Sequence, residues 1–157
     1  PWGDGTMRYS FDGAASRYYF DGLAGVGAPA NQEIVETYNS GGNDFKDNKV
    51  KRRYIRLPGS VDEVLLMREY DSAGTLTAIR YVHANRLGSV VALTNNSGVV
   101  SDKYTYSPYG EAGVGGSSGF PFRYTGQKLF ASVDLYYYKA RWYDPETGRA
   151  RRRPEKP

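Results

Sequence analysis

The chain of 157 residues contains no cysteine, which excludes disulfide bonds, thiol catalysis and cysteine-ligated zinc. Histidine is almost as scarce, because His83 is the only one. No apolar run approaches the ~18 residues that a membrane-spanning helix requires, and the mean hydropathy is −0.63. No charged and then apolar stretch of the kind that forms a signal peptide is visible. We therefore expect no membrane span, no cofactor and no metal ion.

Tyrosine and glycine are abundant instead. The sequence has 15 Tyr against 6 Phe and 2 Trp, and its 19 Gly and 8 Pro interrupt it often. Frequent turn formers between aromatic, β-prone segments predict an all-β fold of serial antiparallel hairpins with little helix. Because aliphatic residues are sparse, tyrosine rings are expected to supply much of the buried surface while their hydroxyl groups find partners.

Strand-length segments alternate with turn signals along most of the chain. Strands are predicted within 7–13 and 17–22, and at 33–38, 50–57, 61–70, 75–82, 89–94 and 99–106. Turns are predicted at 12–13, 21–22, 58–59, 71–74, 95–98, 107–110 and 144–148. Segment 61–70 fits a helix or a strand on periodicity, and the turn after it favours the strand. The Gly- and Ser-rich segment 111–119 is expected to be a mobile loop. Serial hairpins of this kind predict a curved β-ribbon.

The C-terminal quarter is the most distinctive stretch. A short strand is predicted to start at Phe122 and stop at Thr125-Gly126. Residues 136–143 are rich in aromatic side chains and are predicted to form one strand. The segment Asp-Pro-Glu-Thr-Gly at 144–148 then provides a turn, since proline fixes φ and glycine accepts positive φ.

These segments resemble the Rhs (YD-repeat) family. The runs YTGQ at 124–127 and LYYYKARWYDPETGR at 135–149 resemble the signature that closes the Rhs core, and segments 53–66, 80–94 and 103–111 resemble stretches upstream of it. Asn85 stands where the family often has an aspartate. The residues that match the family pattern, here called the signature residues, are Tyr81, His83, Leu87, Gly88, Ser89, Tyr106, Pro108, Tyr109, Gly110, Tyr124, Gly126, Gln127, Tyr137, Tyr138, Arg141, Tyr143, Asp144, Pro145 and Gly148.

The resemblance implies a division of the chain and a function. It divides the chain into an N-terminal repeat fragment at 1–16, an Rhs repeat-associated core at 17–148 and a basic tail at 149–157, which we expect to be disordered. Proteins of this family coil a β-ribbon into a hollow shell, or cocoon, that encloses a C-terminal toxin. The chain is therefore expected to be a structural segment of such a YD-repeat shell, secreted or at the cell surface. Its expected partners are the remainder of the shell or copies of itself, and a toxin polypeptide.

The sequence departs from the family in two respects. Many members cleave themselves after the signature at a DPxG motif with a following aspartate, and neither feature is present after Gly148. The pair Asp144-Pro145 belongs to the signature and receives no catalytic role, so the chain is expected not to be an enzyme. A shell also needs several hundred residues, and this sequence starts at Pro1 and not at Met, which suggests a fragment or a processed product. Open strand edges are sticky, so the chain is expected to pair with copies or a partner.

Several single features admit a second interpretation. His83 could be a base or a ligand, but a partly buried residue bonded to backbone is favoured. Asp62 and Glu63 could act as an acid pair, but neighbouring strand residues face opposite sides. The basic runs at 51–53 and 149–153 could contact nucleic acid, and solvated surfaces are favoured.

Two further functions remain as alternatives to the shell segment. Tyr136–Tyr138 could stack against sugars, which would make the chain a tyrosine-rich module for weak carbohydrate contact or protein binding, although packing is favoured for these rings. An autoprotease remnant is the third interpretation. A self-assembling β-sheet fragment is compatible with the first two.

Overall fold

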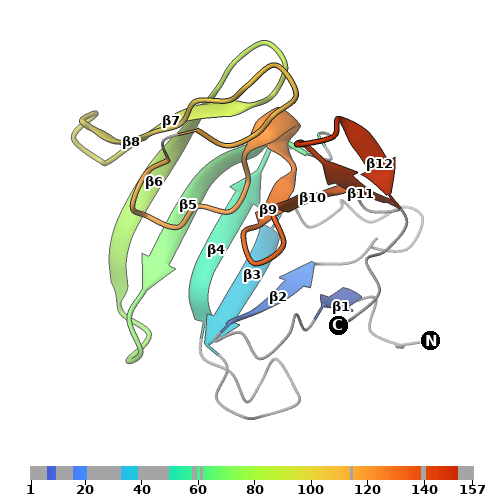
Figure 1. Cartoon of the computed structure of the whole chain (residues 1–157). Helices are drawn as coiled ribbons and strands as arrows, with labels where there is room; N and C mark the ends of the chain where they lie inside the picture. The colour runs from blue at the N-terminus through green and yellow to red at the C-terminus, as the bar shows by residue number, and fades with distance from the viewer. Residues whose placement is uncertain are drawn as a thin grey trace. The chain divides into compact units, whose positions relative to one another are not determined.

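The computed structural model describes residues 7–9, 16–20, 33–38, 50–57, 60, 62–113, 115–138 and 141–151. The regular elements of these segments are β-strands apart from one short 3-10 turn (Figure 1), which confirms the predicted all-β class. The chain divides into two compact units, Pro1–Tyr81 and Val82–Pro157. The turns predicted at 12–13, 21–22 and 58–59 lie outside the described residues.

The first unit is a meander of antiparallel strands that follow one another in chain order. Its elements are β1 (Met7–Tyr9), β2 (Ser16–Phe20), β3 (Glu33–Tyr38), β4 (Val50–Arg56), β5 (Val64–Tyr70) and β6 (Leu76–Ala84), the last of which continues into the second unit. Each strand pairs with the preceding one, and Figure 1 shows β4, β5 and β6 side by side. The strand interpretation of segment 61–70 is therefore confirmed.

Register in the first unit sets which side chains are buried. Tyr54 on β4 lies opposite Met67 on β5, and both side chains are completely buried. A register shift beside Ile55 pairs Arg56 with Val64, so Val64 is buried while the next residue, Leu65, is exposed. Leu65 is the extra residue of this β-bulge, and the bulge keeps Val64 and Met67 on the buried face of β5.

The second unit holds a hairpin, a short 3-10 turn and a separate sheet. The hairpin is β7 (Val90–Thr94) with β8 (Val100–Lys103), and the 3-10 turn covers Tyr124–Gly126. The sheet contains β9 (Lys128–Phe130), β10 (Leu135–Tyr138), β11 (Arg141–Asp144) and β12 (Arg149–Arg151), in the order β12-β11-β10-β9.

Three sequence predictions for the second unit are wrong in part. Residues 136–143 do not form one strand, because Tyr138 on β10 lies opposite Arg141 on β11 in an antiparallel hairpin. The tail predicted to be disordered begins with an ordered strand, β12, which pairs with β11. The strand predicted at 99–106 ends at Lys103, and Tyr106 forms only an isolated bridge with Ala112.

The buried core of the second unit is largely aromatic. Its buried large side chains are Val90, Leu93, Tyr104, Phe120, Phe122, Leu135, Tyr136 and Trp142. Tyr136 and Phe120 have no exposed surface. Two of these eight side chains, Tyr104 and Tyr136, are tyrosines, so the expectation that tyrosine supplies much of the buried surface is confirmed only in part.

Candidate functional site

Four tight turns with one hydrogen-bond geometry position many of the signature residues. They are 71–75, 85–89, 95–99 and 107–111, and in each the side-chain oxygen of the first residue accepts the N–H of the fifth at 2.8–3.1 Å. The fourth residue is a glycine with φ between +74° and +92° that donates its N–H to the first carbonyl. Asp, Asn and Ser all supply that acceptor oxygen. Asn85 therefore accepts the same hydrogen bond that Asp71 accepts in its turn.

Gly110 packs against the signature tyrosines. Its φ is +92°, and a Cβ atom added there would overlap the ring of Tyr124, with Cε1 at 2.8 Å. The carbonyl of Gly110 accepts a hydrogen bond from the buried hydroxyl of Tyr136 at 2.9 Å. Both the backbone conformation and the lack of a side chain at residue 110 are therefore required.

Tyrosine hydroxyl groups tie separate loops together around Tyr124. Tyr124 donates to the carbonyl of Pro108 at 3.1 Å, and Tyr143 donates to the carbonyl of Tyr109 at 2.8 Å. The rings of Tyr124 and Tyr143 are stacked with centroids 6.5 Å apart. Tyr106 donates to the carbonyl of Val90 at 2.5 Å. The network joins the 107–111 turn to β11, and Tyr106 to the hairpin.

The tyrosine hydroxyl groups of this network act as hydrogen-bond donors. Burial raises the pKa of Tyr136 to about 12 and also raises the pKa of Tyr106 and Tyr143. Desolvation disfavours the phenolate form, so the three hydroxyl groups stay protonated at neutral pH. A group with a raised pKa that donates to a backbone carbonyl is a poor general base. The hydroxyl groups of Tyr136, Tyr106 and Tyr143 therefore serve as hydrogen-bond donors to backbone carbonyls.

Thr125 adopts a backbone conformation that β-branched residues seldom occupy, with φ of +48°. Its N–H donates to the hydroxyl of the buried Ser89 at 2.9 Å, and its hydroxyl lies 2.5 Å from that of Tyr138. The side chain of Gln127 donates to the Thr125 carbonyl at 3.2 Å. Three signature residues therefore hold Thr125 in a strained backbone conformation that costs about 1–3 kcal/mol.

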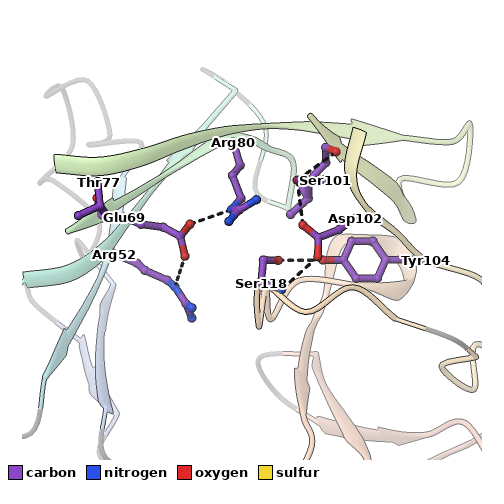
Figure 2. Close-up of polar contacts among 9 residues, drawn as sticks. Arg52, Glu69, Thr77, Arg80, Ser101, Asp102, Tyr104 and Ser118 are labelled. Atoms are coloured by element: carbon purple, nitrogen blue, oxygen red, sulfur yellow. Dashed lines mark hydrogen bonds and ion pairs between the residues drawn. The ribbon is translucent and has the colours of Figure 1, made fainter. Parts of the chain in front are cut away.

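Asp102 is a buried carboxylate that the sequence reasoning missed (Figure 2). Its Oδ1 accepts the N–H of Ser118 at 3.0 Å, and its Oδ2 accepts the hydroxyl of Ser101 at 2.9 Å. The hydroxyl of Ser118 lies 3.2 Å from that of Tyr104, and a Cβ added at Gly116 would overlap the Asp102 carboxyl group. The loop expected to be mobile at 111–119 is thus bound to β8, because a buried carboxylate needs its donors.

The turn after β11 is closed by Asp144. Its Oδ1 accepts the N–H groups of Glu146 at 3.0 Å and Thr147 at 3.3 Å, and its Oδ2 pairs with Arg151 on β12. Burial alone would raise its pKa, but the hydrogen bonds from Thr147 and Glu146 and the charge of Arg151 lower it. Gly148 has φ of +64° and lies against the Tyr109 ring. The predicted turn at 144–148 is confirmed, and the carboxylate has a structural role.

A half-buried charge cluster in the first unit is also drawn in Figure 2. Glu69 on β5 bridges Arg52 on β4, at 3.3 Å, and Arg80 on β6, at 2.7 Å. The hydroxyl of Thr77 donates to the Glu69 carbonyl at 3.1 Å. The three charged side chains are 15–23% exposed, so the carboxylate stabilises two neighbouring strands at once. The run 51–53 is correspondingly less exposed than predicted.

Four other signature residues have exposed side chains. Tyr81, in the first unit, is opposite Leu66 and 43% exposed, and Leu87 at the tip of a turn is 66% exposed. His83 is exposed and its Nε2 lies 2.9 Å from the hydroxyl of Thr94, so the prediction of a partly buried histidine bonded to backbone is wrong. Arg141 is exposed on β11.

The remaining signature residues pack in the second unit. Pro145 is buried in its turn, and Tyr137 on β10 contacts Trp142 and Phe130 with ring centroids 5.2 and 6.3 Å apart. The rings of Tyr136–Tyr138 therefore pack against neighbouring side chains. Within the part of the chain that the structure describes, no group of three or more acidic or histidine side chains could hold a metal ion. No helix among the described residues has the length and apolarity to cross a membrane.

Comparison with known proteins gives partial matches to very long chains. No protein-family model matches the sequence. Salivary gland surface protein 1 of Aedes aegypti is 41% identical over 61 residues, which are 36% of this chain and 2% of that protein. The tRNA3(Ser)-specific nuclease WapA of Bacillus spizizenii is 26% identical over 146 residues, or 90% of this chain and 5% of the nuclease.

Solved structures match nearly the whole chain. In the crystal structure of TcdB2-TccC3-Cdc42 the match covers 94% of this chain and 7% of that one, with a TM-score of 0.61 and 19% identity. In the Tc holotoxin pore of Photorhabdus luminescens it covers 92% and 8%, with a TM-score of 0.55 and 19% identity. The fold therefore resembles that of a segment of these Tc toxin chains, and the chain spans less than a tenth of the length of the proteins it matches.

Proposed function

We propose that this chain is a structural segment of an Rhs/YD-repeat shell and contributes to the wall of a β-cocoon that encloses a toxin polypeptide. The proposal rests on how much of each chain the structural match covers, which is 94% of this chain and 7% of the larger one. A chain that matches almost completely yet occupies a small part of its counterpart fits a wall segment better than an independent enzyme. Secretion and association with other shell segments are part of the same proposal.

The buried polar groups support a mechanical role. Asp102 and Asp144 accept hydrogen bonds from backbone N–H groups of loops, and the tyrosine hydroxyl groups around Tyr124 donate to backbone carbonyls. Catalysis by acid and base requires a titratable group with free access to a substrate. Here the same groups hold turns in place, which supports the proposed role as a rigid scaffold.

The mass of the assembled species tests the proposal. Light scattering behind size-exclusion chromatography, followed by electron microscopy of the main fraction, is expected to give oligomers or filaments that satisfy open strand edges. A stable 17.5 kDa monomer would contradict assembly through open edges. Binding of that monomer to a glycan array would then favour the carbohydrate-binding alternative.

Intact mass after prolonged incubation tests the absence of self-cleavage. The proposal predicts a constant mass over days at pH 5, 7 and 9. A time-dependent loss of a C-terminal fragment would contradict the scaffold and favour the autoprotease alternative. Replacement of Asp102 by Asn would then show whether its carboxylate is involved.

A further inference from the structure

The two edges of the sheet β12-β11-β10-β9 differ in what covers them. The β9 edge is occupied, because Leu129 donates its N–H to the carbonyl of Pro121 at 2.8 Å and Phe122 bridges to Lys128. Arg123 donates in addition to the carbonyl of Gln127 at 2.8 Å. An extra segment thus continues the ladder beyond β9.

The opposite edge has no strand partner among the described residues. Strand β12 (Arg149–Arg151) has β11 as its neighbour on one side, and all three of its residues are exposed. Among the described residues, no segment pairs with its outer side. An edge strand of this kind presents a row of main-chain donors and acceptors to any extended chain of suitable sequence.

The arginine side chains of β12 favour an extended partner segment that is negatively charged. Its register places Arg149 opposite Asp144 and Arg151 opposite Trp142, so both arginines project to one face and Ala150 to the other. Arg152 and Arg153 follow in the sequence. A second copy paired antiparallel through the same edge and centred on Ala150 would place Arg149 opposite Arg151, and like charges directly opposite each other are destabilising. Pairing between two β12 strands is therefore disfavoured.

We propose that β12 is a docking edge for an extended acidic peptide segment, which adds to the sheet as a fifth strand. Main-chain hydrogen bonds to β12 supply affinity, and acidic residues at alternate positions face Arg149 and Arg151. Arg151 already pairs with Asp144, whose carboxylate also accepts two turn N–H groups, so Arg149 is expected to be the main charged contact for the peptide. The inference concerns one edge and holds whether or not the chain belongs to a shell.

Titration of the 15N-labelled, full 157-residue chain with short synthetic peptides tests the proposal. The probe is an acetylated and amidated peptide Thr-Glu-Val-Glu-Val-Glu-Thr, and the matched control peptide has Lys in place of each Glu. The acidic peptide is expected to shift the amide signals of Arg149–Arg151, and the basic one to leave them unchanged. An acidic peptide that is N-methylated at alternate residues is expected to lose binding, because it lacks main-chain donors on one edge.

Charge reversal supplies the protein control. Arg149→Glu is expected to weaken binding of the acidic peptide about tenfold and to strengthen binding of the basic one. Arg141→Glu changes the net charge equally but lies on the inner strand β11, and it is expected to have little effect. Equal effects of the two substitutions, or equal shifts with an oligothymidylate, would overturn the proposal in favour of unspecific anion binding. Absence of shifts at Arg149–Arg151 with the acidic peptide would also overturn it.

Discussion

In the first unit, β4, β5 and β6 form an antiparallel ladder with a register shift in each strand pair, and half-buried charges pair across neighbouring strands through Glu69. In the second unit the strands are three to five residues long, and side chains that bond to the backbone of loops hold the rest. Tyr124, Tyr136 and Asp102 are examples of such side chains. A chain with few aliphatic residues can therefore be ordered by strand ladders or by buried polar side chains. In the second case, order depends on hydrogen bonds that the loss of a single polar atom would remove.

The first way to break this comparison is Gly110→Ala. The added Cβ would overlap the Tyr124 ring, and alanine is disfavoured at φ of +92°, so we expect a loss of about 3 kcal/mol or more in the free energy of unfolding. Chemical denaturation measures it. Gly98→Ala is the matched control, because Gly98 has φ of +74° in an equivalent turn with nothing within 4 Å, and its loss should stay near 1–2 kcal/mol. Equal losses would contradict the packing argument.

The second substitution that tests this comparison is Tyr136→Phe. It removes the buried hydroxyl and leaves the carbonyl of Gly110 without that donor. We expect a loss of about 2 kcal/mol, within the usual range for an unsatisfied buried polar group. Tyr109→Phe serves as control, because the Tyr109 side chain is 64% exposed, and it should change stability by less than about 0.5 kcal/mol. If both variants unfold at the same denaturant concentration, the hydroxyl network does not stabilise the unit.

The third substitution is Glu69→Gln in the first unit. Neutralising the carboxylate weakens contacts to Arg52 and Arg80 but keeps the ladder, so the expected loss is about 1 kcal/mol. Glu63→Gln, at an exposed position before β5, is the control and should be neutral. A loss larger than that of Tyr136→Phe would reverse the contrast between the units.

The smallest effect concerns the pH dependence of stability through Asp144. Its pKa is lower in the folded chain than in the unfolded one, so the unfolded chain binds more protons in acid. This contribution is complete above the unfolded pKa of about 4 and disappears as the pH falls through the folded pKa. The free energy of unfolding should fall less steeply below pH 4 in Asp144→Asn than in the unchanged chain. Parallel pH profiles would contradict the role of the carboxylate.

Local turn chemistry explains which predictions from sequence succeeded. An Asp, Asn or Ser followed three residues later by Gly supplies both the side-chain acceptor and the positive φ, so the turns at 71–74, 95–98 and 107–110 were predictable. The hairpin between β10 and β11 was not, because its connection, Lys139-Ala140, contains no typical turn former. Aromatic residues continue on both sides of it and therefore resemble one strand.

Long-range contacts explain what the sequence did not predict. Asp102 has no motif around it, and its partner Ser118 is 16 residues away in a segment that resembles a flexible linker. Strand β12 consists of residues that usually indicate a solvated tail, and its order depends on pairing with β11 and on Asp144. In both cases a tertiary partner outweighs local composition.

Site-resolved amide hydrogen exchange tests the central claim most directly, namely that buried side chains make the irregular loops of the second unit as rigid as strands. The account predicts that the amides of Ser118 and Thr125, which donate to the buried side chains of Asp102 and Ser89, are protected to a degree comparable with those in β4 and β5. Exchange of these amides at the rate of an unstructured peptide, with protection confined to the strands, would contradict it.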